Sequence, residues 1–169
     1  MNKKESQIIT IIITALMLTG TLFESSAIAQ EHSIQWEPFE EAIQLAEENQ
    51  LPILADIWAP WCGWCKKMQK EVYPELADDF SEQFVWTRLN RDDNETPLQY
   101  RNQTLTPLRL AQTLNAEGVP ALVFLAPDGG YLFHTSGFLE PKRLEPVLMY
   151  VSSGAYQSIS FDNFLATYQ

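Results

Sequence analysis

The stretch from Ala55 to Lys66, ADIWAPWCGWCK, contains both cysteines of the chain, set two residues apart. An apolar run precedes them, LPILADIW over residues 51–58, and its single acid is Asp56. A short apolar run of this kind predicts a buried strand. Helix-forming residues follow in CKKMQKEVY. The two cysteines are therefore expected directly after a strand, at the start of a helix.

This position gives the two sulfurs different chemistry. Cys62 lies at the expected helix N-terminus, where unpaired N–H groups and the positive end of the helix dipole favour the thiolate. The thiolate is the nucleophile in disulfide exchange, so Cys62 is the predicted attacking residue. Cys65, almost one turn further on, can attack a mixed disulfide formed at Cys62 and release the partner.

Other uses of the pair have weaker support. A bridge across so short a loop adds little stability in the chain-entropy model. A structural zinc site needs four ligands, and the chain has just two histidines, His32 and His134. Attachment of a c-type haem requires a histidine after Cys65, where Lys66 stands. A metal-binding or metallochaperone module and a redox-inert interaction domain remain as alternatives, although copper delivery lacks an obvious third ligand.

The first 29 residues have the pattern of a secretory signal peptide. Lys3 and Lys4 give a basic start, residues 8–23 form a largely apolar run, and residues 27–29 read Ala-Ile-Ala. The apolar run is shorter than the roughly 20 residues that span a bilayer, so cleavage is favoured over a retained anchor. Residues 30–169 then form one domain of ordinary size, in a periplasmic or secreted protein.

The composition narrows the class of partner. The chain has a formal net charge of −11 and no basic cluster. Nucleic acids and anionic membrane surfaces are therefore poor candidates. We also expect no stable membrane insertion after signal cleavage, no cofactor and no bound metal.

The hydrophobic pattern predicts an α/β protein with a mixed central sheet. Pro74 should interrupt or kink the helix that follows the cysteines near Tyr73. The polar segment 91–105 is expected to be an inserted loop, and the region 155–169 a helical C-terminal extension. The remaining expected elements, in order, are a helix at 38–49, strands at 51–58 and 84–90, a helix at 107–115, a hairpin of 121–126 and 131–135, and a helix at 141–151.

These features together resemble the thioredoxin family. Its members have a strand with a buried acid leading into W-C-x-x-C-K, matched here by ADIWAPWCGWCK. They also have an aliphatic residue and a cis-proline before a hairpin, matched by Val119 and Pro120 in EGVPALVFLAPDGG. A later glycine corresponds to Gly137. The resemblance covers about residues 39–151 and implies a single thioredoxin-fold domain, a mixed sheet flanked by helices.

The resemblance also implies roles around the cysteines. Asp56 would be buried, have a raised pKa and exchange a proton with Cys65. Pro120 would be cis and face the pair, which leaves the Val119 backbone free to bind an extended substrate segment. Arg88 stands where thioredoxins often have a lysine near the acid. It either pairs with Asp56, holding the carboxylate charged, or faces the surface.

The residues between and beside the cysteines suggest partners and a direction of electron flow. Trp61, Gly63 and Trp64 are the expected substrate-binding surface. The Gly63-Trp64 pair matches neither the Gly-Pro of cytoplasmic thioredoxins nor the Pro-His of strongly oxidising bacterial enzymes. Without a histidine beside Cys62, one source of thiolate stabilisation is missing, so a reducing or intermediate potential is expected.

Within the family, the chain looks most like the exported, SoxW-type thioredoxin-like proteins. This narrower resemblance implies a periplasmic or exported thiol-disulfide oxidoreductase that acts, as a reductase, on disulfide-containing proteins or small thiols. With just two cysteines, the chain cannot relay electrons through a second internal pair. A separate electron donor is therefore expected, such as a membrane thiol-disulfide reductase.

Overall fold

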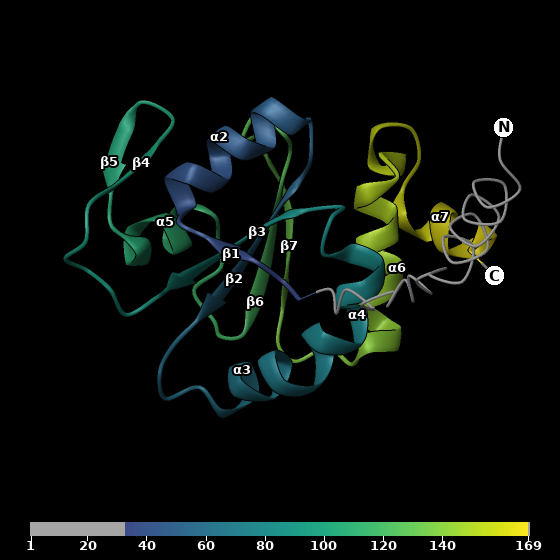
Figure 1. Cartoon of the computed structure of the whole chain (residues 1–169), viewed down its shortest axis with the longest axis horizontal. Helices are drawn as coiled ribbons and strands as arrows, with labels where there is room; N and C mark the ends of the chain where they lie inside the picture. The colour runs from purple at the N-terminus through teal and green to yellow at the C-terminus, as the bar shows by residue number, and fades with distance from the viewer. Residues whose placement is uncertain (1–32, 169) are drawn as a thin grey trace, which may run out of the picture. The chain divides into compact units, whose positions relative to one another are not determined.

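The structure, a computed structural model, describes residues 33–168. The expected signal peptide, residues 1–29, lies outside this range. Figure 1 follows the chain from β1 to α7. The elements are β1 (Trp36–Glu37), α2 (Phe39–Asn49), β2 (Ile53–Trp58), α3 (Gly63–Lys67), the π-helical segment η1 (Met68–Val72), α4 (Tyr73–Phe80), β3 (Val85–Asn90), β4 (Leu98–Tyr100), β5 (Gln103–Leu105), α5 (Pro107–Thr113), β6 (Ala121–Leu125), β7 (Tyr131–Ser136), α6 (Pro141–Ser152), the 3-10 turn η2 (Ala155–Gln157) and α7 (Phe161–Thr167).

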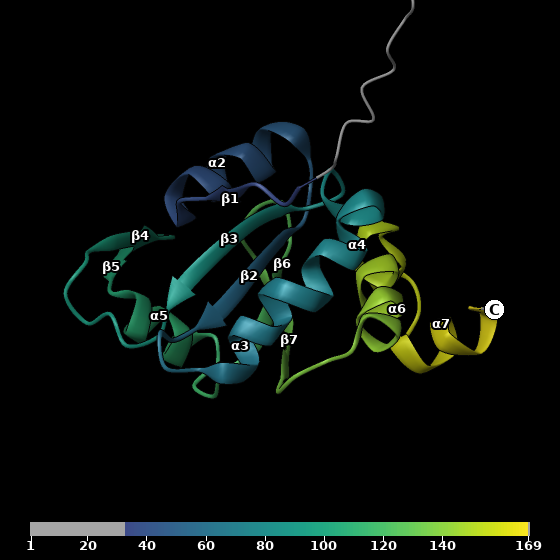
Figure 2. The same ribbon diagram turned by 60° about the horizontal axis from the view of Figure 1, so that its bottom comes forward.

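The main sheet is mixed, as the sequence predicts. Its strands lie in the order β1-β3-β2-β6-β7. The pairs β1–β3 and β2–β3 are parallel, whereas β6 pairs antiparallel with both β2 and β7. Figure 2 shows β2 and β3 side by side, with the loop after β2 leading into α3. The cysteines therefore follow the central strand of the sheet.

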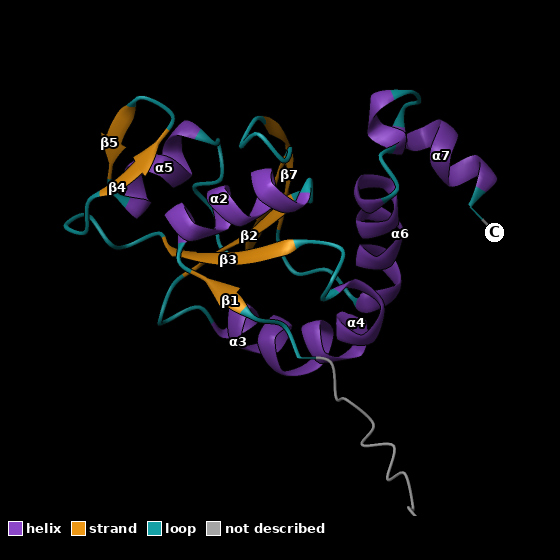
Figure 3. Ribbon diagram, turned by 45° about the horizontal axis from the view of Figure 1, so that its top comes forward, coloured by secondary structure: helices purple, strands orange, loops and turns teal. Residues whose placement is uncertain are grey.

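Alternation along β2 divides the core between the two faces of the sheet. Ile53 and Ile57 pack into a cluster with buried residues of α2 and α5, whereas Leu54 packs into a second cluster with η1, α4 and α6. Helices accordingly cover both faces (Figure 3). Successive strand side chains point to opposite faces, so Asp56 shares the face of Leu54. The strand period thus puts the acid on the side of the helix that bears the cysteines.

The polar segment 91–105 is more ordered than its composition predicts, because part of it forms the two-stranded β4–β5 sheet. Leu98 and Tyr100 are buried, and the Tyr100 ring packs edge-on against Phe39 of α2. The backbone N–H of Gln99 also donates to the Glu40 carboxylate at 2.6 Å. The expectation of a plain loop was wrong because these strands are too short to give a readable alternation.

Pro74 does not end the helical path, but the helix is irregular directly before Tyr73, where the sequence predicts an interruption or kink. The helical path continues through α3, η1 and α4, and Pro74 lies in the first turn of α4. The preceding turn is π-helical, a wider turn that changes the hydrogen-bond partners just before the proline. Because a proline in the first turn needs no backbone donor, the chain accommodates it there.

The C-terminal region contains η2 and α7, and Phe161 and Phe164 pack against Tyr150 of α6.

Within residues 33–168, no helix has the length and apolar character required to cross a membrane.

Candidate functional site

Cys62 and Cys65 form a disulfide at the start of α3, with an S–S distance of 2.02 Å. Cys62 is the N-cap residue, and its Sγ accepts a hydrogen bond from the Cys65 amide at 3.0 Å. A backbone donor aimed at this sulfur would stabilise a negative charge on it once the bond is reduced. The geometry therefore suits Cys62 as the thiolate of the pair.

The loop before β6 contributes a second segment to the site, next to the disulfide. The Val119–Pro120 peptide bond is cis, which confirms the geometry predicted from the sequence. Val119 packs against the small apolar cluster of Ala59, Cys62 and Cys65. Within the described chain, neither the N–H nor the C=O of Val119 has a hydrogen-bond partner. The backbone of Val119 is thus unpaired beside the disulfide.

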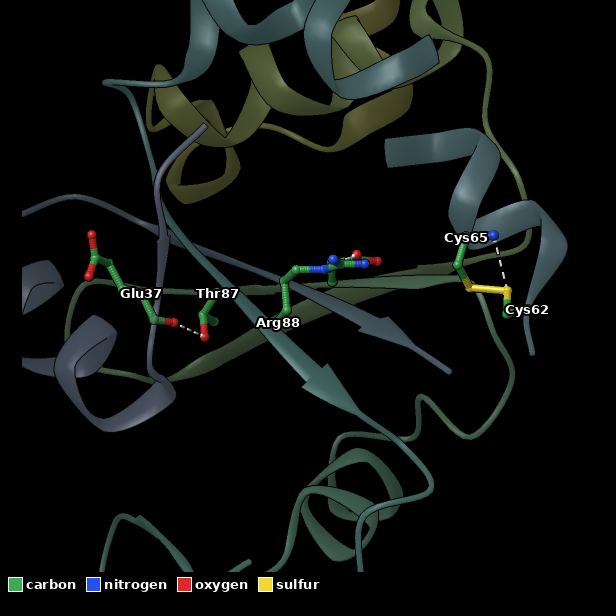
Figure 4. A network of polar contacts seen from close by, with 6 residues as sticks. Glu37, Cys62, Cys65, Thr87 and Arg88 are labelled. Carbon is green, nitrogen blue, oxygen red and sulfur yellow. Dashed lines mark hydrogen bonds and ion pairs between the residues drawn. A yellow bond between two sulfur atoms is a disulfide. The ribbon is translucent and has the colours of Figure 1, made fainter. Parts of the chain in front are cut away.

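Asp56 and Arg88 meet because they are register partners on the parallel strands β2 and β3. Arg88 Nε donates to Asp56 Oδ2 at 2.9 Å, so the sequence alternative in which Arg88 faces the surface is wrong. The Arg88 guanidinium lies over the rings of Trp36, at 4.9 Å, and Trp58, at 4.5 Å. Figure 4 shows this side chain extending from β3 toward the side where the cysteines lie.

Burial has the largest effect on the pKa of Asp56. Its side chain is 0% exposed, and loss of solvent raises the pKa of the carboxyl above the ordinary value. The Arg88 charge and the Tyr73 hydroxyl lower the pKa, but burial outweighs both. A carboxylate whose pKa is raised is a better proton acceptor than an ordinary aspartate.

The outer rim of the pair is aromatic. Trp61 and Trp64, on either side of Cys62, are 65% and 57% exposed. Trp64 packs on Phe138 with ring centroids 5.0 Å apart. The Trp61 indole donates to Asp92 Oδ2 at 2.6 Å, which ties the rim to the loop after β3. Exposed aromatic surface of this kind is typical of a contact site for partners.

Gly63 leaves space between the two tryptophans. A Cβ built there would meet no atom within 4 Å, so the fold does not require glycine at this position.

Among residues 33–168, no group of three or more metal-ligating side chains gathers at the cysteines or elsewhere.

Residues 39–152 match the family of thioredoxin-like domains. The chain belongs to this family. A thioredoxin of Haemophilus influenzae is 43% identical over 63 residues, which are 37% of this chain and 58% of the relative. A thioredoxin of Acidithiobacillus ferridurans is 39% identical over 74 residues, covering 42% of this chain and 68% of the relative.

Two solved structures share the thioredoxin-like fold. A thioredoxin-fold protein from Helicobacter pylori superposes with a TM-score of 0.57 at 20% identity, covering 70% of this chain and 80% of the other. The DsbH oxidoreductase gives a TM-score of 0.59 at 20% identity, covering 81% and 97%. This thioredoxin-like chain spans about half the length of several curated thioredoxins that it matches.

Three residues that contact the predicted site residues of this thioredoxin-like chain were not predicted from the sequence. Tyr73, Trp36 and Asp92 all contact predicted site residues. Trp36 lies on a two-residue strand whose pairing with β3 gives almost no periodic signal. The π-helical turn hides Tyr73, because it shifts the helical spacing that would otherwise relate Tyr73 to Cys65.

Proposed function

We propose that the protein is an exported thiol-disulfide oxidoreductase that acts as a reductase of disulfides in proteins or small molecules. One observation carries the proposal. Cys62 and Cys65 form a bonded pair beneath two exposed tryptophans, with an unpaired Val119 backbone beside it and a buried carboxyl behind it.

The first chemical step uses the reduced pair. The Cys62 thiolate attacks one sulfur of the substrate disulfide, that S–S bond breaks, and the other substrate sulfur leaves as a thiolate. A mixed disulfide then joins Cys62 to the substrate. The Cys65 amide, which donates to Cys62 Sγ, favours the thiolate that begins this step.

The second step releases the substrate. Cys65 gives its thiol proton to the Asp56 carboxylate and its sulfur attacks Cys62 Sγ. The bond from Cys62 to the substrate breaks, the second substrate thiolate leaves, and the Cys62–Cys65 disulfide forms. Two electrons have passed to the substrate. A dithiol electron donor must then reduce the pair again, and a membrane thiol-disulfide reductase is the donor class that we propose.

Substrate recognition would combine backbone and side-chain contacts. An extended substrate segment can pair with the free N–H and C=O of Val119, in the manner of an added strand. Trp61 and Trp64 offer apolar surface on the other side of the pair. Such contacts place few demands on the substrate sequence, which suits a range of disulfide-containing polypeptides.

The direction and location rest on sequence features. The basic and apolar segment before residue 30 supports export, and the absence of histidine between Cys62 and Cys65 supports a reducing or intermediate potential. The SoxW-type resemblance agrees with a role in supplying reducing equivalents outside the cytoplasm. DsbH, whose structure shares this fold, is named an oxidoreductase, which agrees with the reaction class alone.

A trapping experiment tests the proposal. Cys65→Ser keeps the attacking sulfur and removes the resolving one, so the reduced variant should accumulate a mixed disulfide with a disulfide-bonded polypeptide such as insulin. The matched control, Cys62→Ser, should accumulate far less. Equal trapping by both variants would overturn the assignment of Cys62, and no trapping by either would overturn the proposed activity. Metal analysis of the reduced protein would reveal the alternative metal-binding module as stoichiometric copper or zinc.

A further inference from the structure

The buried carboxyl of Asp56 has one oxygen paired and one oxygen free. Oδ2 accepts the hydrogen bond from Arg88 Nε at 2.9 Å. Oδ1 is fully buried and has no hydrogen-bond partner within residues 33–168. A buried carboxylate oxygen without a hydrogen-bond donor destabilises the charged form of the acid. Arg88 alone therefore leaves the ionised form of Asp56 incompletely stabilised.

Tyr73 brings a second unpartnered polar atom to the same place. Its hydroxyl is buried and has no partner at full hydrogen-bond geometry among residues 33–168, yet it lies close enough to Asp56 to act on that carboxyl as a hydrogen-bond donor. Two buried polar groups without partners, one a donor and one an acceptor, are an uncommon combination in a folded core. A small movement that joins them would satisfy both.

The surroundings fix the orientation of the Tyr73 ring. It packs edge-on against Trp36 at 5.5 Å and against Trp86 at 5.9 Å between centroids. Tyr73 begins α4 directly after the π-helical turn. Burial, followed by the charge of Asp56, raises the pKa of Tyr73 well above its ordinary value. The hydroxyl therefore keeps its proton across the physiological range and can act only as a donor toward a carboxylate.

We propose that Tyr73 is a positioning residue for Asp56, whose hydroxyl donates a hydrogen bond to Oδ1 of the ionised carboxylate. This inference rests on the proposed function for its chemical use. When Cys65 passes its proton to Asp56, the carboxyl becomes neutral and the Tyr73 proton stays on its own oxygen. Tyr73 thus favours the charged state that receives the proton.

Among residues 33–168, the remaining neighbours of Asp56 exert no competing charge on it. Arg88 of β3 is the charged group that acts on it, and Tyr73 is the other titratable group that does so. On the opposite side of β2, the register partner of Asp56 is Leu122 of β6. Cys65, on α3, is bonded to Cys62 in this oxidised form and does not titrate. The two donors therefore act on different oxygens of one carboxyl.

The test follows the carboxyl titration of Asp56 in the oxidised protein by carbon-13 NMR, with Asp56→Asn to assign the signal. Tyr73→Phe removes only the hydroxyl, and the Asp56 midpoint should rise by about one pH unit. Tyr150→Phe is the matched control: this buried tyrosine donates to the Ile159 carbonyl at 2.7 Å, away from the cysteines. The control should leave the midpoint unchanged.

A midpoint that does not move in folded Tyr73→Phe would overturn the inference. Should that variant fail to fold, 3-fluorotyrosine introduced at position 73 keeps the shape and strengthens the donor. It should then lower the Asp56 midpoint, and an unchanged midpoint would again contradict the inference. The titration needs no thiol exchange. A shifted midpoint in a protein that traps no substrate would therefore refute the proposed function while leaving the Tyr73 contact intact.

Discussion

The two sides of the Cys62–Cys65 pair differ in the polarity and the burial of their side chains. On the core side of the pair, the buried Asp56 carboxyl is paired with the half-buried Arg88 and interacts with the buried Tyr73 hydroxyl. In front of it, Trp61 and Trp64 are large apolar side chains left in solvent. A folded protein normally buries large apolar side chains and exposes charged ones. Both departures gather around one disulfide, which indicates a site shaped for chemistry on one side and for contact on the other.

The two sides also differ in the contacts that fix the positions of their side chains. Register between β2 and β3 fixes the inner polar group, and Arg88 is further held between two tryptophan rings. The outer rim depends on loop contacts, namely the Trp61–Asp92 hydrogen bond and the packing of Trp64 on Phe138. Changes on the inner side should therefore alter proton transfer, and changes on the outer side should alter partner binding.

The largest effect should come from Asp56→Asn, which keeps the shape of the side chain and removes its ability to accept a proton. General acid–base catalysis contributes about 10²–10⁴-fold, so we expect resolution of the mixed disulfide to slow about 100-fold near neutral pH. Rapid-mixing kinetics of substrate release measures this step. Asp79→Asn, at an exposed aspartate of α4, is the control. A normal release rate in Asp56→Asn would remove Asp56 from the mechanism.

The same substitution should change how stability depends on pH. Burial raises the pKa of Asp56 above 3.8 in the folded protein, so the folded state holds this proton to higher pH than the unfolded state does. The Asp56 contribution to the free energy of unfolding therefore falls as pH rises from its unfolded pKa through its raised folded pKa, and is constant above that. Denaturant titrations over this window should give a less negative slope for Asp56→Asn than for the unsubstituted protein.

A smaller and different effect is expected from Trp64→Ala on the outer rim. The side chain is 57% exposed, so the free energy of unfolding should change by less than about 1 kcal/mol. Loss of an aromatic contact should raise KM for a polypeptide disulfide about tenfold, equivalent to about 1.4 kcal/mol, with little change in kcat. Steady-state kinetics measures both constants. Tyr131→Ala, at another exposed aromatic residue, is the control and should leave KM unchanged.

If Trp64→Ala lowered kcat and left KM alone, the separation between the two sides would be wrong. The same conclusion would follow if Asp56→Asn raised KM without slowing release. Either outcome would mean that the rim and the buried group act as one unit.

Much of the fold and of the inner site could be predicted from the sequence. The buried strand with one acid, the CxxC spacing and the Val-Pro pair are local patterns with a direct physical meaning. Strand alternation places Asp56 toward the helix face, and the pairing of β2 with β3 completes its contact with Arg88. The resemblance to the thioredoxin family rests on several such motifs in order along the chain, and the hairpin among alternating strands and helices predicts the mixed sheet.

The parts that were missed depend on contacts between distant segments or on irregular backbone. The contact between Asp92 and Trp61 joins positions 31 residues apart. The π-helical turn before Tyr73 breaks the helical spacing, and it also explains why Pro74 did not end the helix. The β4–β5 hairpin gains its stability from packing on α2, which no pattern within 91–105 reveals.

The reduction potential of the Cys62/Cys65 couple tests the central claim most directly. It can be measured by equilibrating the protein with glutathione or dithiothreitol buffers and quantifying the oxidised fraction. A reductase without histidine between its cysteines should lie below about −180 mV, toward the value of about −270 mV that is typical of thioredoxin. A potential near −120 mV, roughly that of the strongly oxidising bacterial enzymes, would contradict the account.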